Sequence, residues 1–158
     1  MIGNIAQFTL LHVLLSTVGI IAGLVVAGGL IAGRRLEGWV VTFLVTTFLT
    51  NLTGFGFPFV VLMPSHILGG LSLLLLPVVA FAVYRKRLRG AWRAVFVIGA
   101  VTALYFNVFV LVTQLFRKVP AMIALAPTQK ELPFALTHVL LLVIFVILGR
   151  AARQGYPE

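Results

Sequence analysis

The chain has 158 residues, of which 61% are hydrophobic and 9% are charged, and it contains no cysteine. Its mean hydropathy is +1.17, whereas an average soluble domain is about half apolar and about a quarter charged. This composition excludes a soluble globular fold, and the missing cysteine excludes disulfides, thiolate metal sites and iron–sulfur clusters. The net charge of +9 does not indicate nucleic-acid binding, because the basic residues lie in short clusters between apolar runs, as topology signals do.

Five apolar runs follow one another, each bounded by charge, proline or glycine. They cover residues 5–33, 39–62, 66–84, 92–116 and 134–149, and about 20 apolar residues suffice to cross a bilayer as a helix. The first run is longer than a signal-peptide core and has no basic residue before it, so we expect it to remain as a span. The sequence predicts an all-α integral membrane protein, with about five transmembrane helices forming one domain over residues 1–158.

The basic residues are divided unequally between the two predicted sides of the membrane. Three of the twelve lie on one side, namely Arg117, Lys118 and Lys130, and the other nine lie on the opposite side. Because cytoplasmic loops carry the excess of Lys and Arg, this distribution predicts an outside N-terminus and a cytoplasmic C-terminus. Trp39 and Trp92 fall at the predicted cytoplasmic interface, where indole rings prefer to lie.

Small and polar residues mark the inward faces of helices in lipid. On the first span His12, Ser16, Gly19 and Gly23 form one stripe at helical spacing. The second span carries a ridge of threonines, and the stretch 54–59 that follows predicts irregular backbone, which must be buried or line a cavity. We therefore expect a pocket lined by polar residues of three spans, namely Ser16, Thr50, Asn51, Thr53, Asn107 and Gln114.

Two connections between the spans allow more than one interpretation. The basic run at 84–93 is typical of an orientation signal in a tight turn, and it also suits an anionic lipid or a partner. The outer connection, 119–132, is the longest, and its apolar start predicts a segment on the membrane surface, a segment folded back into the bundle, or a lid.

Three histidines, His12, His66 and His138, belong to three different spans and share the predicted outer layer. Two of them could ligate a b-type haem, with the propionates paired to Arg117, Lys118 and Lys130. All three could instead bind Zn, Cu or Fe as neutral ligands. The remaining interpretations are that the rings snorkel or hydrogen-bond the loop backbone at the interface, or that they belong to a functional pocket without a bound metal or haem.

The acidic residues narrow these alternatives. The chain has no aspartate, and Glu37, Glu131 and Glu158 all lie outside the predicted hydrocarbon region. A buried carboxylate relay, usual in proton-driven carriers, is therefore not expected, and this favours electron transfer. Met63 and Met122 are either soft sulfur ligands for Cu(I) or plain apolar filler.

Four stretches, TGFGFPF (53–59), LMPSH (62–66), LYFNVFVLVTQLF (104–116) and KVPAMIALAPTQ (118–129), resemble those of small polytopic inner-membrane proteins of bacteria. The resemblance implies a bacterial inner-membrane location and carries no established activity. A looser similarity to membrane cytochromes b is limited to histidines on separate helices. The chain lacks the two haem-spaced histidine pairs of cytochrome b561, so that similarity implies one haem at most.

Three functional hypotheses follow. The first is a redox protein in which the histidine cluster holds one haem b or metal ion and exchanges electrons with quinone or a redox partner. The second is a binding or transport module for an apolar or weakly polar small molecule. The third is a structural subunit of a larger membrane complex or a homo-oligomer.

Overall fold

The computed structural model describes residues 2–57 and 63–156, and all regular structure within these ranges is helical. The predicted all-α class is therefore confirmed for the described chain. Its elements in order are α1 (Ile2–Ile31), α2 (Glu37–Gly54), α3 (Pro64–Ala80), the π-helical segment η1 (Phe81–Arg85), α4 (Trp92–Lys118), the short α5 (Pro120–Leu125) and α6 (Leu132–Gly155).

Four helical segments are long and apolar enough to cross a membrane, namely Asn4–Ile31, Pro64–Arg85, Trp92–Lys118 and Leu132–Gly155. Large apolar side chains cover their surfaces: Leu74 is 73% exposed and Ile147 is 61% exposed. Exposed leucine and isoleucine in this number are unfavourable in water and suit a hydrocarbon environment. These features are those of a helical membrane protein.

Within the predicted span 39–62, the regular helix α2 ends at Gly54. The N–H groups of Phe55 and Gly56 donate to the carbonyl groups three residues earlier, those of Leu52 and Thr53, in a tight turn that ends the regular helix. The expected irregular backbone is thus confirmed as far as Phe57, and its remainder lies outside the described residues. The last helix, by contrast, continues beyond the predicted residue 149 to Gly155.

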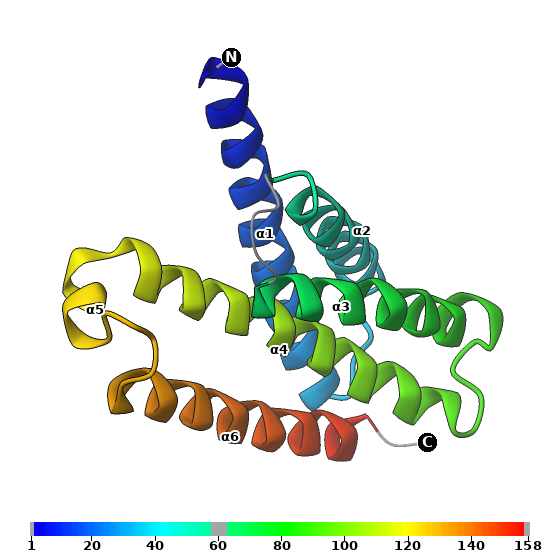
Figure 1. The fold of residues 1–158 in the computed structure, drawn as a ribbon. Helices are drawn as coiled ribbons and strands as arrows, with labels where there is room; N and C mark the ends of the chain where they lie inside the picture. The colour runs from blue at the N-terminus through cyan, green and yellow to red at the C-terminus, as the bar shows by residue number, and fades with distance from the viewer. Residues whose placement is uncertain (1, 58–62, 157–158) are drawn as a thin grey trace.

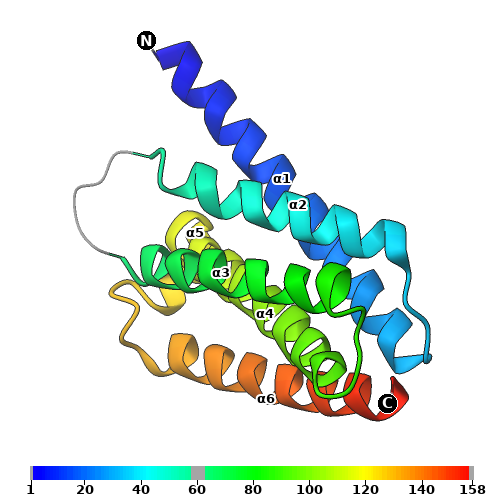
Figure 2. The same cartoon turned by 90° about the vertical axis from the view of Figure 1, so that its right-hand side faces the viewer.

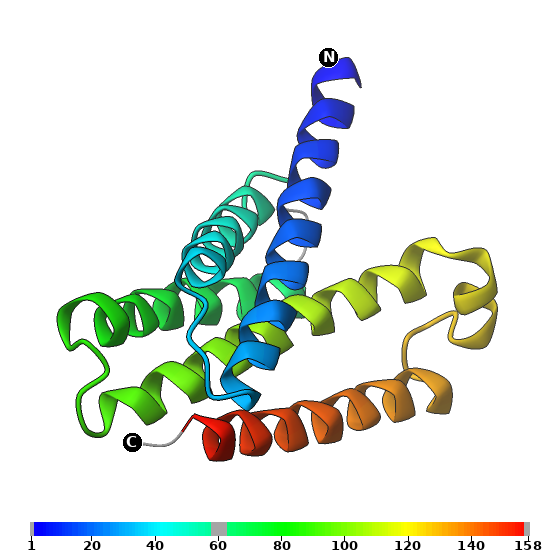
Figure 3. The same ribbon diagram turned by 180° about the vertical axis from the view of Figure 1, so that it is seen from behind.

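The helix α4 lies at the centre of the bundle and contacts α1, α3 and α6 (Figure 1). The antiparallel pair α1 and α2 crosses the layer formed by α3, α4 and α6, as the view from behind also shows (Figure 3). Seen from the side, the connections fall at two opposite ends (Figure 2). We call the end with Phe55–Phe57, Met63 and α5 the α5 end, and the end with 32–36, 86–91 and the close of α6 the basic end.

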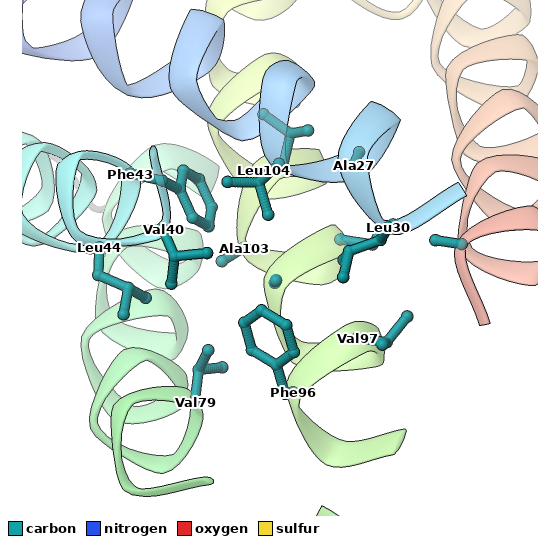
Figure 4. Packing of buried hydrophobic residues seen from close by; sticks show 14 of the residues in the cluster. Ala27, Leu30, Val40, Phe43, Leu44, Val79, Phe96, Val97, Ala103 and Leu104 are labelled. Atoms are coloured by element: carbon teal, nitrogen blue, oxygen red, sulfur yellow. The ribbon is translucent and has the colours of Figure 1, made fainter. Parts of the chain in front are cut away.

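Small residues allow the central helices to approach closely. A Cβ added at Gly23 would lie 2.6 Å from Leu104 Cδ1 and 2.9 Å from Phe43 Cε2. Phe43 and Leu104 are both 1% exposed and pack where α1, α2 and α4 meet (Figure 4). The predicted glycine stripe of the first helix is therefore a packing face, as small residues are in other membrane bundles.

The basic end is closed by a backbone contact between α1 and α6. A Cβ at Gly155 would overlap the carbonyl oxygen of Ile31, and one at Gly33, which has φ +70°, would lie 3.1 Å from the Gly155 oxygen. Only glycine permits both the close approach and the left-handed backbone without strain. The C-terminal turn of α6 thus seals the connection between α1 and α2.

Candidate functional site

His12 joins α1 to α2 at the α5 end. Its Nδ1 lies 2.9 Å from Thr53 Oγ1, and that hydroxyl donates its proton to the Leu49 carbonyl at 2.8 Å. Because the hydroxyl has one proton, His12 Nδ1–H is the donor in the first bond. The ring also packs edge-on against Phe57, with the centroids 5.2 Å apart.

His66 caps the start of α3. Its ring Nδ1 accepts a hydrogen bond of 3.1 Å from the backbone N–H of Met63. The backbone N–H of His66 donates to the Met63 carbonyl at 2.9 Å. A neutral imidazole that accepts at Nδ1 carries its proton at Nε2, so Nε2 has no lone pair for a metal while the cap holds. His66 is thereby assigned a structural task.

His138 lies in an aromatic cluster between α4 and α6. Its ring centroid is 4.3 Å from that of Phe109 and 4.2 Å from that of Phe134. Nδ1–H donates to the Phe134 carbonyl at 2.9 Å, and Nε2 lies 3.2 Å from the hydroxyl of Thr113. The side chain is 9% exposed, and the Thr113 hydroxyl also donates to the Phe109 carbonyl at 3.0 Å.

The three imidazoles are thus close to the same end of the bundle, but His12 bonds between α1 and α2, His138 between α4 and α6, and His66 at the start of its own helix. Across 2–57 and 63–156, no group of three His, Cys, Asp or Glu side chains could hold a metal ion. The shared three-histidine centre predicted from His12, His66 and His138 is therefore not formed. Common depth along the helices does not bring rings together, because helix rotation sends them toward different neighbours.

Two of the six residues predicted to line a pocket, Asn51 and Asn107, belong to a polar network instead. Asn51 Nδ2 donates to the Thr47 carbonyl at 2.8 Å and to Ser72 Oγ at 3.0 Å. Asn107 Nδ2 donates to Thr47 Oγ1 at 3.2 Å. These bonds connect α2, α3 and α4 through side chains that are buried or half-buried. Thr50 is buried beside them, while Ser16 is half-buried on α1 and takes no part in the network.

A pocket of about 260 Å³ lies at the α5 end, where the start of α3 meets the last turns of α4. Arg117 reaches across it and donates from Nη1 to Met63 Sδ at 2.9 Å. Gln114 and Arg117 were both among the predicted site residues. The lining consists of Met63, Pro64, Ser65, Thr113, Gln114, Arg117 and Gln129.

A turn held by hydrogen bonds to Glu131 places Gln129 at this pocket. The carboxylate of Glu131 accepts hydrogen bonds from the Thr128 hydroxyl at 2.7 Å, the Thr128 N–H at 3.1 Å and the Lys130 N–H at 3.0 Å. The Thr128 hydroxyl, followed by these amides, lowers the pKa of Glu131 from its ordinary value, because each bond favours the charged form. We call the connection 119–132, which consists of α5 and this turn, the strap. Gln129 adopts φ +60° within it.

Arg117 is the charged residue of the pocket. Lys118 and Lys130, predicted with it as cofactor-binding cations, are exposed and do not line the pocket. The ion pair shown by the described side chains joins Arg35 to Glu37 at the other end, so Arg117 has no carboxylate partner among them. A guanidinium beside two amides and the Ser65 hydroxyl presents several donors to a carboxylate or phosphate. The Thr113 hydroxyl already donates its proton to the Phe109 carbonyl at 3.0 Å.

Thr113 and Gln129 are among the lining side chains that sequence reasoning missed. Thr113 precedes Arg117 by four residues and so shares its helix face, a signal that could have found it. Gln129 lies in the connection, where no periodicity applies. Comparison with protein-family models, curated proteins and solved structures gave no match for this chain.

Proposed function

We propose that the chain is a polytopic membrane protein that binds a small organic anion in the pocket around Arg117, as a binding or transport module. The single observation that carries this proposal is the unpaired guanidinium of Arg117 in a pocket lined by Gln114 and Gln129. The substrate class is a carboxylate or phosphate compound small enough for about 260 Å³, which is below the range of sites for drug-sized ligands.

Charge distribution supports an orientation in which the α5 end faces outside. Arg117, Lys118 and Lys130 lie toward that end, whereas the other nine basic residues lie toward the basic end. The positive-inside rule then assigns the basic end to the cytoplasm. In this orientation the pocket opens toward the outer surface, and a bacterial inner membrane is the setting that we propose.

A fifth crossing by α2 is supported by its length and its hydrogen bonds. Its 18 residues extend about 27 Å at about 1.5 Å per residue, close to the roughly 30 Å of hydrocarbon. Thr42 and Thr46 donate to carbonyl groups one turn earlier, and Asn51 bonds to Thr47 and Ser72. Polar groups satisfied in this way are tolerated within a bundle.

Anion titration of the purified full chain in detergent tests the proposal. Acetate, succinate, benzoate and inorganic phosphate are the probes, and the readout is the thermal unfolding midpoint. We expect at least one probe to raise Tm, and Arg117→Ala to weaken its binding by about ten-fold or more, as loss of a charge-assisted bidentate contact does. Lys118→Ala removes the neighbouring charge outside the pocket and should leave binding unchanged.

Two outcomes would contradict the proposal. One is a Tm that no probe raises in the wild-type chain. The other is an equal loss of binding in Arg117→Ala and Lys118→Ala, which would mean that diffuse charge at this end, rather than the pocket, attracts the anion. Gln114→Ala provides an independent check, because it removes a lining donor without changing the net charge.

A second proposal keeps the redox function, now with one histidine. His138 donates from Nδ1 to a backbone carbonyl, which is the bond that leaves Nε2 free of its proton and orients ligand histidines in metalloproteins. A haem b, or a bare Zn, Cu or Fe ion, would then take His138 as its protein ligand after Thr113 turns away. An absorption spectrum and elemental analysis of the purified chain test this proposal.

A further inference from the structure

A second cleft, of about 370 Å³, lies at the basic end between the start of α2 and η1. The cleft has a charged rim and an apolar floor. The rim is formed by Arg35, Glu37 and Arg87, with Tyr84 beside them, and the floor by Val40, Val41 and Val83. Such a division into a cationic rim and an aliphatic floor matches a molecule that has an anionic head and a hydrocarbon body.

The rim has excess positive charge. Arg35 pairs with Glu37, which sits in the first turn of α2, where a carboxylate interacts favourably with the helix dipole. Arg87 has no such pair among the described side chains, and it is exposed on a turn with φ +50°. The neighbouring ammonium of Lys86 lies over the rings of Phe81 and Trp92, at 5.6 Å and 5.5 Å from their centroids. Arg87 is therefore the basic residue of the rim whose charge no described carboxylate balances.

The π-helical segment determines this placement. The N–H of Lys86 donates to the Phe81 carbonyl, five residues earlier, at 3.0 Å, so one more residue is included in the turn than in an α-helix. Two residues later, the N–H of Leu88 donates to the Ala82 carbonyl at 3.0 Å, and Leu88 is 3% exposed. With Leu88 anchored inside, its neighbour Arg87 points outward beside Tyr84. π-Helical turns of this kind are frequent at functional sites.

An exposed apolar stripe continues from the floor along α2. Val41, Val45, Phe48 and Leu52 follow one another at helical spacing, and they are 46%, 51%, 41% and 52% exposed. A soluble phosphate compound has no hydrocarbon part that could cover this stripe. An acyl chain that starts at the cleft and runs along α2 covers it.

We propose that this cleft binds the headgroup of an anionic phospholipid, with its phosphate between Arg35 and Arg87 and an acyl chain along the α2 stripe. The Tyr84 hydroxyl donates to a further headgroup oxygen. At the basic end, which we assign to the cytoplasm, anionic lipids are the abundant negative partners of basic residues. The cleft makes this attraction specific, because two guanidinium groups enclose one phosphate.

Lipid titration monitored by native mass spectrometry of the full chain in detergent tests the proposal. The probes are dioleoylphosphatidylglycerol and zwitterionic dioleoylphosphatidylcholine, with glycerol-3-phosphate and inorganic phosphate as soluble phosphates. We expect the phosphatidylglycerol to bind more tightly than the other three. Arg87→Gln should weaken its binding by about ten-fold, and Glu37→Gln should tighten it, because the substitution frees Arg35.

Arg89→Gln is the matched control, since it changes the same residue type two positions away, outside the cleft, and should alter binding by less than about two-fold. Equal losses in Arg87→Gln and Arg89→Gln would overturn the proposal in favour of diffuse attraction. Equal affinity for phosphatidylcholine would also overturn it. If glycerol-3-phosphate or inorganic phosphate binds as tightly as the lipid, the cleft belongs to a soluble phosphate and the lipid assignment fails.

Discussion

Asn107 of α4 donates a hydrogen bond of 3.2 Å to the hydroxyl of Thr47 on α2, and the two side chains are 6% and 0% exposed. No water competes for a bond at this depth, so the pair connects the two helices directly. We expect Asn107→Leu to lower the free energy of unfolding by about 1 kcal/mol, within the range measured for bonds between membrane helices.

A double-mutant cycle with Thr47→Val isolates this bond, with unfolding followed in mixed micelles of mild detergent and dodecyl sulfate. The coupling energy should account for most of the loss. Thr17→Val is the control, because Thr17 is exposed and donates only to its own helix at Val13. A coupling energy near zero would show that the pair is merely adjacent.

Two glycines of α1 should respond in opposite ways to alanine. A Cβ at Gly23 would lie 2.6 Å from Leu104 Cδ1, whereas nothing lies within 4 Å of one at Gly28. Overpacking costs about 1–3 kcal/mol, so Gly23→Ala should lower Tm. Gly28→Ala should leave Tm unchanged or raise it, because alanine favours the helix by about 1 kcal/mol. Equal Tm values for the two variants would mean that α1 does not pack against α4 as described.

The strap at the α5 end should loosen in acid. The pKa of Glu131 is lowered by its hydrogen bonds, so its contribution is fully present above the ordinary value of 4.5 and is lost as the pH falls through the lowered pKa. Protection of the Thr128 and Lys130 amides from hydrogen exchange reports this change. Glu131→Gln should remove the dependence on pH, and retention of the dependence in that variant would assign it to another group.

The three histidines should behave differently if the protein carries a haem b. Because His66 Nδ1 accepts the Met63 N–H, His66→Ala should leave the Soret band in place and destabilise the start of α3. Loss of the band in His138→Ala alone would support His138 as the ligand. Loss in His12→Ala as well would restore ligation by two histidines, against the placement described above. A purified chain with neither a Soret band nor bound metal removes the redox proposal.

The helices were predictable because hydropathy and charge act locally. The predicted run 92–116 became α4, Trp92–Lys118. A proline lies in the first or second position of α3, α5 and α6, where its missing N–H is harmless. Neither α5 nor η1 was predicted, since a six-residue helix and a five-residue π turn leave no periodic pattern that a window can detect.

The site was predictable only in part. Gln114 was predicted to line a pocket with the polar residues of α2, and Arg117 was predicted to pair with haem propionates; both line the pocket at the α5 end. His12 and His138 were identified by their type and depth and do not meet, because the rotation of each helix about its axis decides which neighbour a ring contacts. On the polar ridge of α2, Thr47 and Thr50 are buried, whereas Thr42 and Thr46 are half-buried. Asn51 and Thr47 hydrogen-bond to Ser72 and Asn107. Which side chains meet across helices depends on the tertiary structure, and spacing along one sequence does not determine it.

The glycine seal between Ile31 and Gly155 has a consequence for biogenesis. The helix α1 is synthesised before every other described helix, and α6 is synthesised after them. The contact between Ile31 and Gly155 therefore forms only once the other described helices have been made, and until then the last turn of α1 lacks it.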